Sequence, residues 1–201
     1  MNVLANSHTP HPHAVRDPQP MLARALSEWG GKTDLWVFGY ASLIWRPDFD
    51  VAEQRVARVH GWHRALKMWS RINRGTVECP GLVFALLSGG SCHGAVLKVE
   101  RRHGDEVLHK LWEREMMTGV YDPKWLQCGT THGPVKALAF TLSRRSPNFT
   151  GELSPDRYRE IFSTSCGKYG STLEYADLTL RSLQQHGIQD TALQKLLSHA
   201  P

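Results

Sequence analysis

The order of the apolar segments constrains the fold of this chain more than any other feature. Short runs with the alternation or the β-branched content of strands come first, and most segments with helical periodicity follow them. This order predicts an α+β domain whose sheet is antiparallel or mixed, either open or closed into a barrel. The chain has 201 residues, of which 41% are hydrophobic, so one domain with a sizeable core fits it.

The expected strands are short apolar runs that end at glycines or polar residues. They cover residues 35–38, 55–62, 82–87, 94–99 and 135–142. The 82–87 run is almost continuously apolar, as in a buried strand. Gly89 and Gly90 are expected to form the turn between the third and fourth strands.

The expected helices are amphipathic segments with recognisable start and stop signals. They cover residues 21–30, 105–118, 154–167, 171–186 and 191–197. Ser154 followed by Pro155 is a favourable helix start, and Gly187 ends the fourth helix.

Residues 1–20 are expected to form a flexible tail, and residues 21–201 a single catalytic domain. The tail is polar, interrupted by prolines and without the apolar core of an export signal. His8, His11 and His13 lie in it, and such histidines more often bind metal adventitiously than physiologically. The four cysteines form no Cys-x-x-Cys pair, so reduced thiols and a cytoplasmic location are expected.

The charge distribution argues against macromolecular partners. The net charge is +5, but basic residues are scattered and reach only pairs such as Arg144-Arg145. No basic stripe for nucleic acid is present. No apolar stretch approaches the ~18 residues of a membrane helix, so neither nucleic acid nor membrane is an expected partner.

Glu115 is the most informative single residue. On a helical wheel it lies among Leu108, Leu111 and Trp112, which define the buried stripe, whereas Glu113 points to the opposite side. A carboxylate on a buried face is costly unless it is partnered, and burial raises its pKa toward that of a useful base. The alternatives are a structural glutamate paired with an arginine, or a helix that ends early.

The segment after the first strand is a candidate ligand loop. Gly39, Ala41 and Ser42 are small, so a ligand with a carboxylate and an amine could approach the backbone there. The alternative is an ordinary turn.

Four ordered blocks together resemble the ChaC-type, glutathione-specific γ-glutamylcyclotransferases. The blocks are residues 36–49 (WVFGYASLIWRPDF), residues 74–76 with 80–83 (RGT and PGLV), residues 114–115 with 119–121 (RE and GVY), and residues 167–175 (GKYGSTLEY). The match extends from about Trp36 to Leu183. The family usually reads Tyr-Gly-Ser-Leu in the first block, and Ala41 replaces that glycine here.

The resemblance implies a compact mixed β-barrel with flanking helices, without metal or organic cofactor. It assigns the catalytic role to Glu115, which the helical wheel had already singled out. It assigns substrate binding to the loop formed by Val37, Phe38, Gly39, Tyr40, Ala41, Ser42 and Leu43. If the glycine that Ala41 replaces needs a positive φ, Ala41 carries strain; otherwise the change is harmless.

The implied reaction cleaves glutathione to 5-oxoproline and Cys-Gly. The α-amine of the γ-glutamyl group attacks its own γ-carbonyl, and Glu115 accepts the proton. We expect Arg74 and Tyr169 to bind substrate, with Tyr40 and Arg71 as further candidates. For the tyrosines the alternative is a core aromatic, and for the arginines a surface salt bridge, more so for Arg71.

Three rival functions stay open. The same chemistry could act on other γ-glutamyl amino acids or amines. A non-catalytic module could bind a γ-glutamyl metabolite, although an unpaired buried Glu115 argues against it. A metalloenzyme could use His60 and His63, which lie on opposite faces if that segment is a strand. We expect a monomer or a weak homodimer.

Overall fold

A computed structural model describes residues 16–201 of the chain, and five strands form its central barrel. They are β1 (Leu35–Gly39), β2 (Glu53–Ser70), β3 (Gly81–Val99), β4 (Asp122–Thr130) and β5 (Gly133–Thr141). The order is β1-β3-β2-β4-β5, and β5 closes the barrel by pairing in parallel with β1 and β3. All other pairings are antiparallel, so the expected mixed barrel is confirmed.

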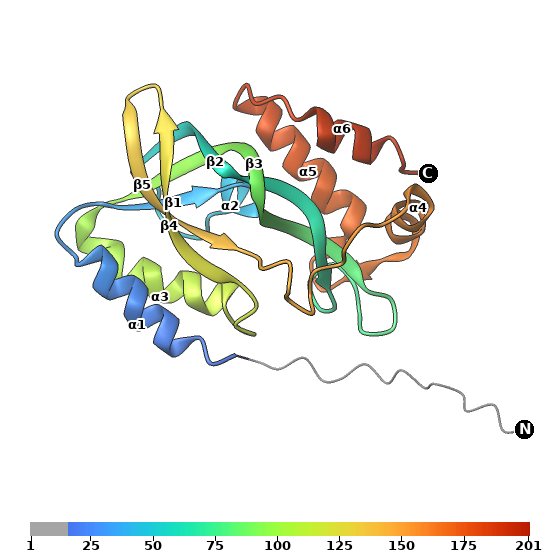
Figure 1. Ribbon diagram of the computed structural model, residues 1–201, viewed down its shortest axis with the longest axis horizontal. Coiled ribbons are helices and arrows are strands. Elements are labelled where there is room, and N and C mark those ends of the chain that lie inside the picture. Colours follow the sequence, from blue (N-terminus) through green and yellow to red (C-terminus); the bar gives the residue numbers. More distant parts are fainter. Residues whose placement is uncertain (1–15) are drawn as a thin grey trace, which may run out of the picture.

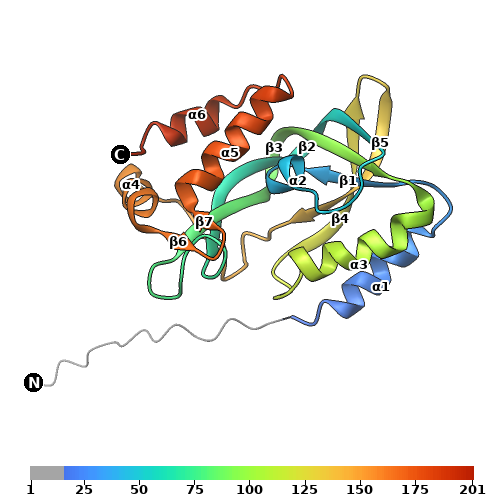
Figure 2. The same cartoon turned by 180° about the vertical axis from the view of Figure 1, so that it is seen from behind.

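Helices flank the barrel on two sides (Figures 1 and 2). They are α1 (Gln19–Trp29), α2 (Ser42–Trp45), α3 (Gly104–Glu115), α4 (Pro155–Thr164), α5 (Thr172–Gln185) and α6 (Thr191–Leu197). Helices α1 and α3 pack together on one side, and α4, α5 and α6 lie at the other. A 3-10 turn (Arg101–His103) precedes α3, and the two-residue strands β6 (Cys166–Gly167) and β7 (Gly170–Ser171) precede α5.

The interior of the barrel is apolar because alternate residues of each strand point inward. Val37 of β1 and its paired neighbours, Leu97 of β3 and Leu138 of β5, share one face and are completely buried. Burial of such side chains is the main favourable term in folding, worth about 1.5–3 kcal/mol for each. This core fixes where β1 ends, and the candidate ligand loop starts at that point.

The expected cap at Ser154 is confirmed, and Ser171 caps the following helix in the same way. The Ser154 side chain accepts a hydrogen bond from the Arg157 N–H, and Ser171 accepts one from the Glu174 N–H. The α6 bounds agree with the expected residues 191–197. Helix α3 ends at Glu115, so the expected end at residue 118 is wrong and the alternative of an early end holds.

The expected turn at Gly89 and Gly90 is wrong. Both glycines have positive φ, 98° and 71°, but they lie inside the continuous strand β3. Opposite them on β2 lies Gly61, which also has a positive φ, and the pairing register shifts between His60 and Trp62. A positive φ suits a turn or a bulge, and pairing with β2 makes this one a bulge.

The folded chain begins earlier than expected. Residues 16–20 were assigned to the tail, but α1 begins at Gln19 and the Arg16 side chain bonds to Gly119, Tyr121 and Asp122. His8, His11 and His13 lie outside the described residues.

Candidate active site

Glu115 lies at the last position of α3, on the buried face that the sequence predicts. Val107, Leu108, Leu111 and Trp112 are buried on the same helix. The Glu115 side chain keeps only 16% of its surface exposed. The helix ends here because Met116, whose N–H still bonds to the Trp112 carbonyl, has φ −112° and ψ 14°, which are not helical values.

Glu115 is paired, which corrects the expectation of an unpartnered carboxylate. Its Oε1 lies 2.9 Å from Nε of Arg114. Burial raises the pKa of Glu115, and the positive charge of Arg114 opposes that rise without cancelling it. Because Glu115 is paired, its burial no longer speaks against a non-catalytic binding module.

Arg114 joins Glu115 to the candidate ligand loop. Its Nη1 lies 2.7 Å from Oδ2 of Asp48, and its Nη2 donates to Oγ of Ser42 at 3.1 Å. One guanidinium thus holds the carboxylate and the first residue of α2 together. A planar fork with several donors suits this task better than a lysine would.

Three buried tyrosines surround the carboxylate. Tyr40, Tyr121 and Tyr175 all have raised pKa values, mainly because they are buried, and the negative charge of Glu115 adds to the effect. The Tyr40 hydroxyl donates to the Phe140 carbonyl at 2.9 Å. Tyr40 therefore fits the alternative of a core aromatic with a satisfied hydroxyl.

Tyr121 and Tyr175 are site residues that the sequence did not single out. Both lie inside the blocks that carry the family resemblance, so that resemblance was the available signal. Neither stands out as polar chemistry, because an aromatic residue among apolar neighbours is usually part of the core.

The candidate loop lines a small cavity next to Glu115. The cavity has a volume of about 30 Å³. Its walls are Tyr40, Ala41, Ser42, Leu43, Phe84, Glu115, Tyr121, Phe140 and Tyr175. Val37, Phe38 and Gly39 do not line it, because they belong to β1 and are buried on its two faces.

Ala41 shows no strain of the kind considered from the sequence. Its φ is −148°, outside the left-handed region that favours glycine. Its side chain is buried against the barrel. The replacement of the family's glycine is therefore compatible with the backbone of the loop.

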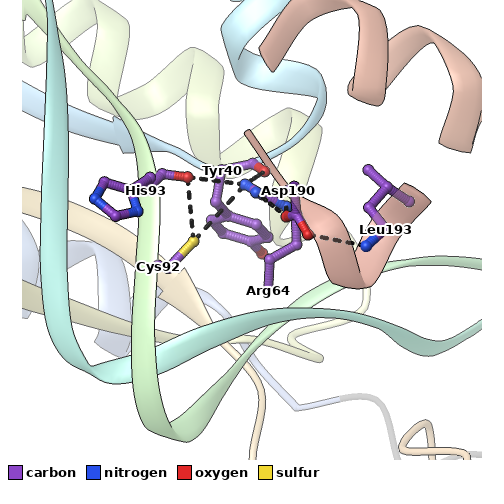
Figure 3. A network of polar contacts seen from close by, with 6 residues as sticks. All are labelled: Tyr40, Arg64, Cys92, His93, Asp190 and Leu193. Atoms are coloured by element: carbon purple, nitrogen blue, oxygen red, sulfur yellow. Dashed lines mark hydrogen bonds and ion pairs between the residues drawn. The ribbon is translucent and has the colours of Figure 1, made fainter. Parts of the chain in front are cut away.

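Arg64 supports the loop at Tyr40 (Figure 3). Its Nη1 donates to the carbonyls of Tyr40 at 2.8 Å and His93 at 3.0 Å. Its Nε and Nη2 bind Oδ2 of Asp190, and Oδ1 of Asp190 accepts the Leu193 N–H at the start of α6. The C-terminal helix is thus tied to the residue that opens the loop.

A larger cleft of about 960 Å³ adjoins the small cavity. The two share Ser42, Glu115, Tyr121 and Tyr175. A volume of this size falls in the range of small-molecule sites. Arg74 and Tyr169 line the cleft, so the structure brings them to the same site as Glu115.

Arg74 is more constrained than Tyr169. Its guanidinium donates to the Tyr169 carbonyl, stacks over the Tyr175 ring at 4.8 Å and lies 4.0 Å from Glu174. Tyr169 is 45% exposed, with the Arg46 guanidinium 5.2 Å from its ring centre. Their roles in substrate binding stay predictions.

Close glycine packing brings the blocks around Arg74 together. A Cβ on Gly81 would collide with the Arg74 carbonyl, and one on Gly167 would collide with the backbone of Gly75. Only glycine allows these backbones to approach so closely. The second and fourth blocks are therefore joined by backbone packing beside the cleft.

The described residues provide no other candidate centre of the expected kinds. Within residues 16–201, no group of three or more His, Cys, Asp or Glu side chains is placed to hold a metal ion. His60 is exposed, and His63 bonds through Nδ1 to the Gly89 carbonyl at 2.8 Å. No helix of the described chain has both the length and the apolar content to cross a membrane.

The chain is similar in sequence to one protein family and to curated members of it. The family model described as ChaC-like protein matches residues 35–200. The glutathione-specific γ-glutamylcyclotransferase of Escherichia coli (strain K12) is 32% identical over 177 residues, covering 88% of this chain and 77% of that protein. The glutathione-specific γ-glutamylcyclotransferase 1 of Homo sapiens is also 32% identical, over 73% of this chain and 68% of its own length.

A solved structure shares the fold. The crystal structure of a yeast γ-glutamylcyclotransferase specific to glutathione superposes with a TM-score of 0.75. It is 21% identical in sequence and covers 84% of this chain and 96% of its own. At this identity the likeness speaks for the fold alone.

Proposed function

The chain belongs to the ChaC-like protein family, and from this premise we propose that it is a γ-glutamylcyclotransferase that cleaves glutathione. The names of the E. coli and human relatives support this substrate. The observation that carries the proposal is a carboxylate of raised pKa, Glu115, facing the loop at Tyr40–Leu43 across a small cavity.

The reaction needs no protein nucleophile. The α-amine nitrogen of the γ-glutamyl group bonds to the γ-carbonyl carbon, and the amide bond to cysteine breaks. The products are 5-oxoproline and Cys-Gly, and one proton moves from the attacking nitrogen to the leaving nitrogen. The reaction balances without water or a redox partner, so neither a metal nor an organic cofactor enters the proposal.

Glu115 is the proton acceptor in this scheme. Burial raises its pKa, which makes its ionised form a stronger base than an exposed glutamate. Arg114 keeps the carboxylate ionised and orients it. A positioned general base contributes ~10²–10⁴-fold to the rate.

The loop holds the γ-glutamyl group in its folded conformation. The first N–H groups of α2, at Ser42 and Leu43, have no partners within the helix and can bind the substrate carboxylate or the oxyanion of the tetrahedral intermediate. Arg74 and Tyr169 contact the substrate further out in the cleft. Val37, Phe38 and Gly39 support the loop from β1.

We also propose a cellular location and an oligomeric state for the enzyme. We place the enzyme in the cytoplasm, since its four free cysteines fit a reducing compartment. It acts as a monomer or weak homodimer, without nucleic acid as a partner.

The test is a product assay with purified protein and glutathione, without added metal. We expect 5-oxoproline and Cys-Gly in equal amounts by mass spectrometry. Product from other γ-glutamyl compounds but not from glutathione would redirect the substrate assignment. Glutathione binding without any product would favour the binding-module alternative.

A further inference from the structure

The cleft outside the small cavity carries an excess of positive charge. Eight basic and four acidic side chains line it. The basic ones are Arg16, Arg46, Arg71, Arg74, Lys110, Arg114, Arg145 and Lys168, and the acidic ones are Asp48, Glu113, Glu115 and Asp122. A cleft of one dominant sign attracts ligands of the opposite sign.

Most of these cations are already compensated. Arg16, Arg46, Arg74, Lys110 and Arg114 each form an ion pair with a carboxylate.

Three cations differ from the rest. Within residues 16–201, Arg71, Arg145 and Lys168 form no ion pair with any acidic side chain. For Arg71 this overturns the alternative of a surface salt bridge.

The backbone brings these three residues to one end of the cleft. The Trp69 N–H donates to the Asn148 carbonyl at 2.9 Å, which docks the loop that contains Arg145. The Lys168 N–H donates to the Ile72 carbonyl at 2.8 Å, so the β6–β7 turn docks further along the same segment (Figure 2). Arg71 lies between the two docking points.

Arg71 is the best prepared of the three to bind an anion. Its Nη1 donates to Oδ1 of Asn148 at 3.1 Å, and its guanidinium lies 6.0 Å from the Trp69 ring centre. These contacts orient the guanidinium plane of Arg71 and leave its other N–H groups free to bind a ligand. Partial burial lowers the pKa of Arg71, but an arginine stays charged at neutral pH.

The substrate supplies the matching anion. With the γ-glutamyl group at Glu115 and the loop, the leaving half extends into the cleft and carries its own carboxylate at the glycine end. This placement depends on the proposed function.

We propose that Arg71, Arg145 and Lys168 form a subsite for the terminal carboxylate of the leaving Cys-Gly unit. Arg71 binds it directly, and the other two supply a favourable field. The subsite selects γ-glutamyl peptides with a free C-terminal carboxylate over neutral γ-glutamyl amines. Because it is remote from the scissile bond, it acts on KM rather than on kcat.

The test measures KM while one group is changed in the enzyme and its proposed partner is changed in the substrate. Glutathione is compared with its glycine ethyl ester, in which a neutral and slightly larger ester group replaces the terminal carboxylate. We expect the ester to raise the wild-type KM about 10- to 100-fold, as for loss of a charged hydrogen bond. Arg71→Ala should raise the KM for glutathione by a similar factor. The same substitution should leave the KM for the ester nearly unchanged.

Matched variants separate charge from structure. Arg71→Lys keeps the charge and should recover part of the loss, and Arg145→Ala and Lys168→Ala should each show a smaller rise in KM. Arg144→Ala is the control, because Arg144 adjoins Arg145 but bonds to the Ser88 carbonyl and does not line the cleft. Circular dichroism establishes that each variant is folded.

A binding experiment makes the result independent of turnover. Calorimetry measures the affinity of glutathione and of its ester for Glu115→Gln, with and without Arg71→Ala. Equal affinity for the two ligands, or the same loss for both on removing Arg71, would overturn the subsite. Failure of the wild type to form 5-oxoproline would instead count against the proposed function alone.

Discussion

Two arginine–carboxylate pairs hold the same loop at different residues. Arg64, paired with Asp190, binds the Tyr40 carbonyl at the start of the loop. Arg114, paired with Glu115, binds the Ser42 hydroxyl two residues later. The two carboxylates are equally exposed, at 16% of their side-chain surface, so exposure does not distinguish them.

The difference lies in what else each carboxylate binds. Both oxygens of Asp190 are occupied, Oδ2 by Arg64 and Oδ1 by the Leu193 N–H. Glu115 meets Arg114 through Oε1 and lines both cavities. We infer that the first pair serves stability and the second serves chemistry, and the following predictions test that division.

Breaking the Arg64–Asp190 pair should have the largest effect on stability. Arg64→Ala leaves a carboxylate without its cation, which costs ~3–5 kcal/mol in the free energy of unfolding. Asp190→Ala also removes the N-cap of α6, for about 1 kcal/mol more. Urea unfolding followed by circular dichroism measures both losses.

Asp190→Asn is the control for this prediction. Asparagine caps a helix as well as aspartate does, so only the charge is lost and the effect should be intermediate. If Arg64→Ala unfolded at the wild-type urea concentration, the structural role of this pair would have to be abandoned.

The pH dependence of activity should reflect the titration of Glu115 in the Arg114–Glu115 pair. Because burial raises the pKa of Glu115, the acid limb of kcat/KM should lie above the ordinary glutamate value of about 4.3. Below that limb the rate should fall about tenfold per pH unit, since the base must be ionised. Melting temperatures over the same pH range separate titration from unfolding, and a limb at or below about 4.3 contradicts the assignment.

Glu115→Gln should change stability only slightly and in the favourable direction. A raised folded-state pKa means that the stability Glu115 contributes at low pH is lost as pH rises through that pKa. A neutral glutamine removes this loss, and Arg114 keeps Asp48 as a partner. The melting temperature at pH 7 should equal or exceed that of the wild type; a clear decrease would give Glu115 a structural role like that of Asp190.

Ala41→Gly should have the smallest effect. The backbone at Ala41 does not need glycine, so the change mainly adds entropy to the unfolded chain, for about 0.4–1 kcal/mol. Activity on glutathione should stay close to wild type. A large gain in kcat/KM would show that Ala41 restricts a loop that the family's glycine leaves free.

Local signals in the sequence predicted much of the fold. The cap at Ser154 was predictable because a helix cap depends on residues only three positions away. The strand β4 was missed because most of its residues are half-exposed, and α2 because it has only four residues. Gly89 and Gly90 were misassigned because Gly61, on another strand, decides between turn and bulge.

In the candidate site too, local sequence signals predict some residues, whereas the positions of others depend on the tertiary structure. Glu115 was predictable from the helical period, and the family resemblance supported it. Arg64 and Asp190 are 126 positions apart, and no local pattern relates them. The positions of Tyr121 and Tyr175 around the carboxylate likewise follow from the closure of the barrel and the docking of α5.

The most direct measurement is the rate of 5-oxoproline release from glutathione by Glu115→Gln, in a sample whose melting temperature matches the wild type. The substitution keeps the shape of the side chain and removes the base. We predict a fall of ~10²–10⁴-fold in kcat. Release at the wild-type rate from this folded variant would contradict the assignment of Glu115 as proton acceptor.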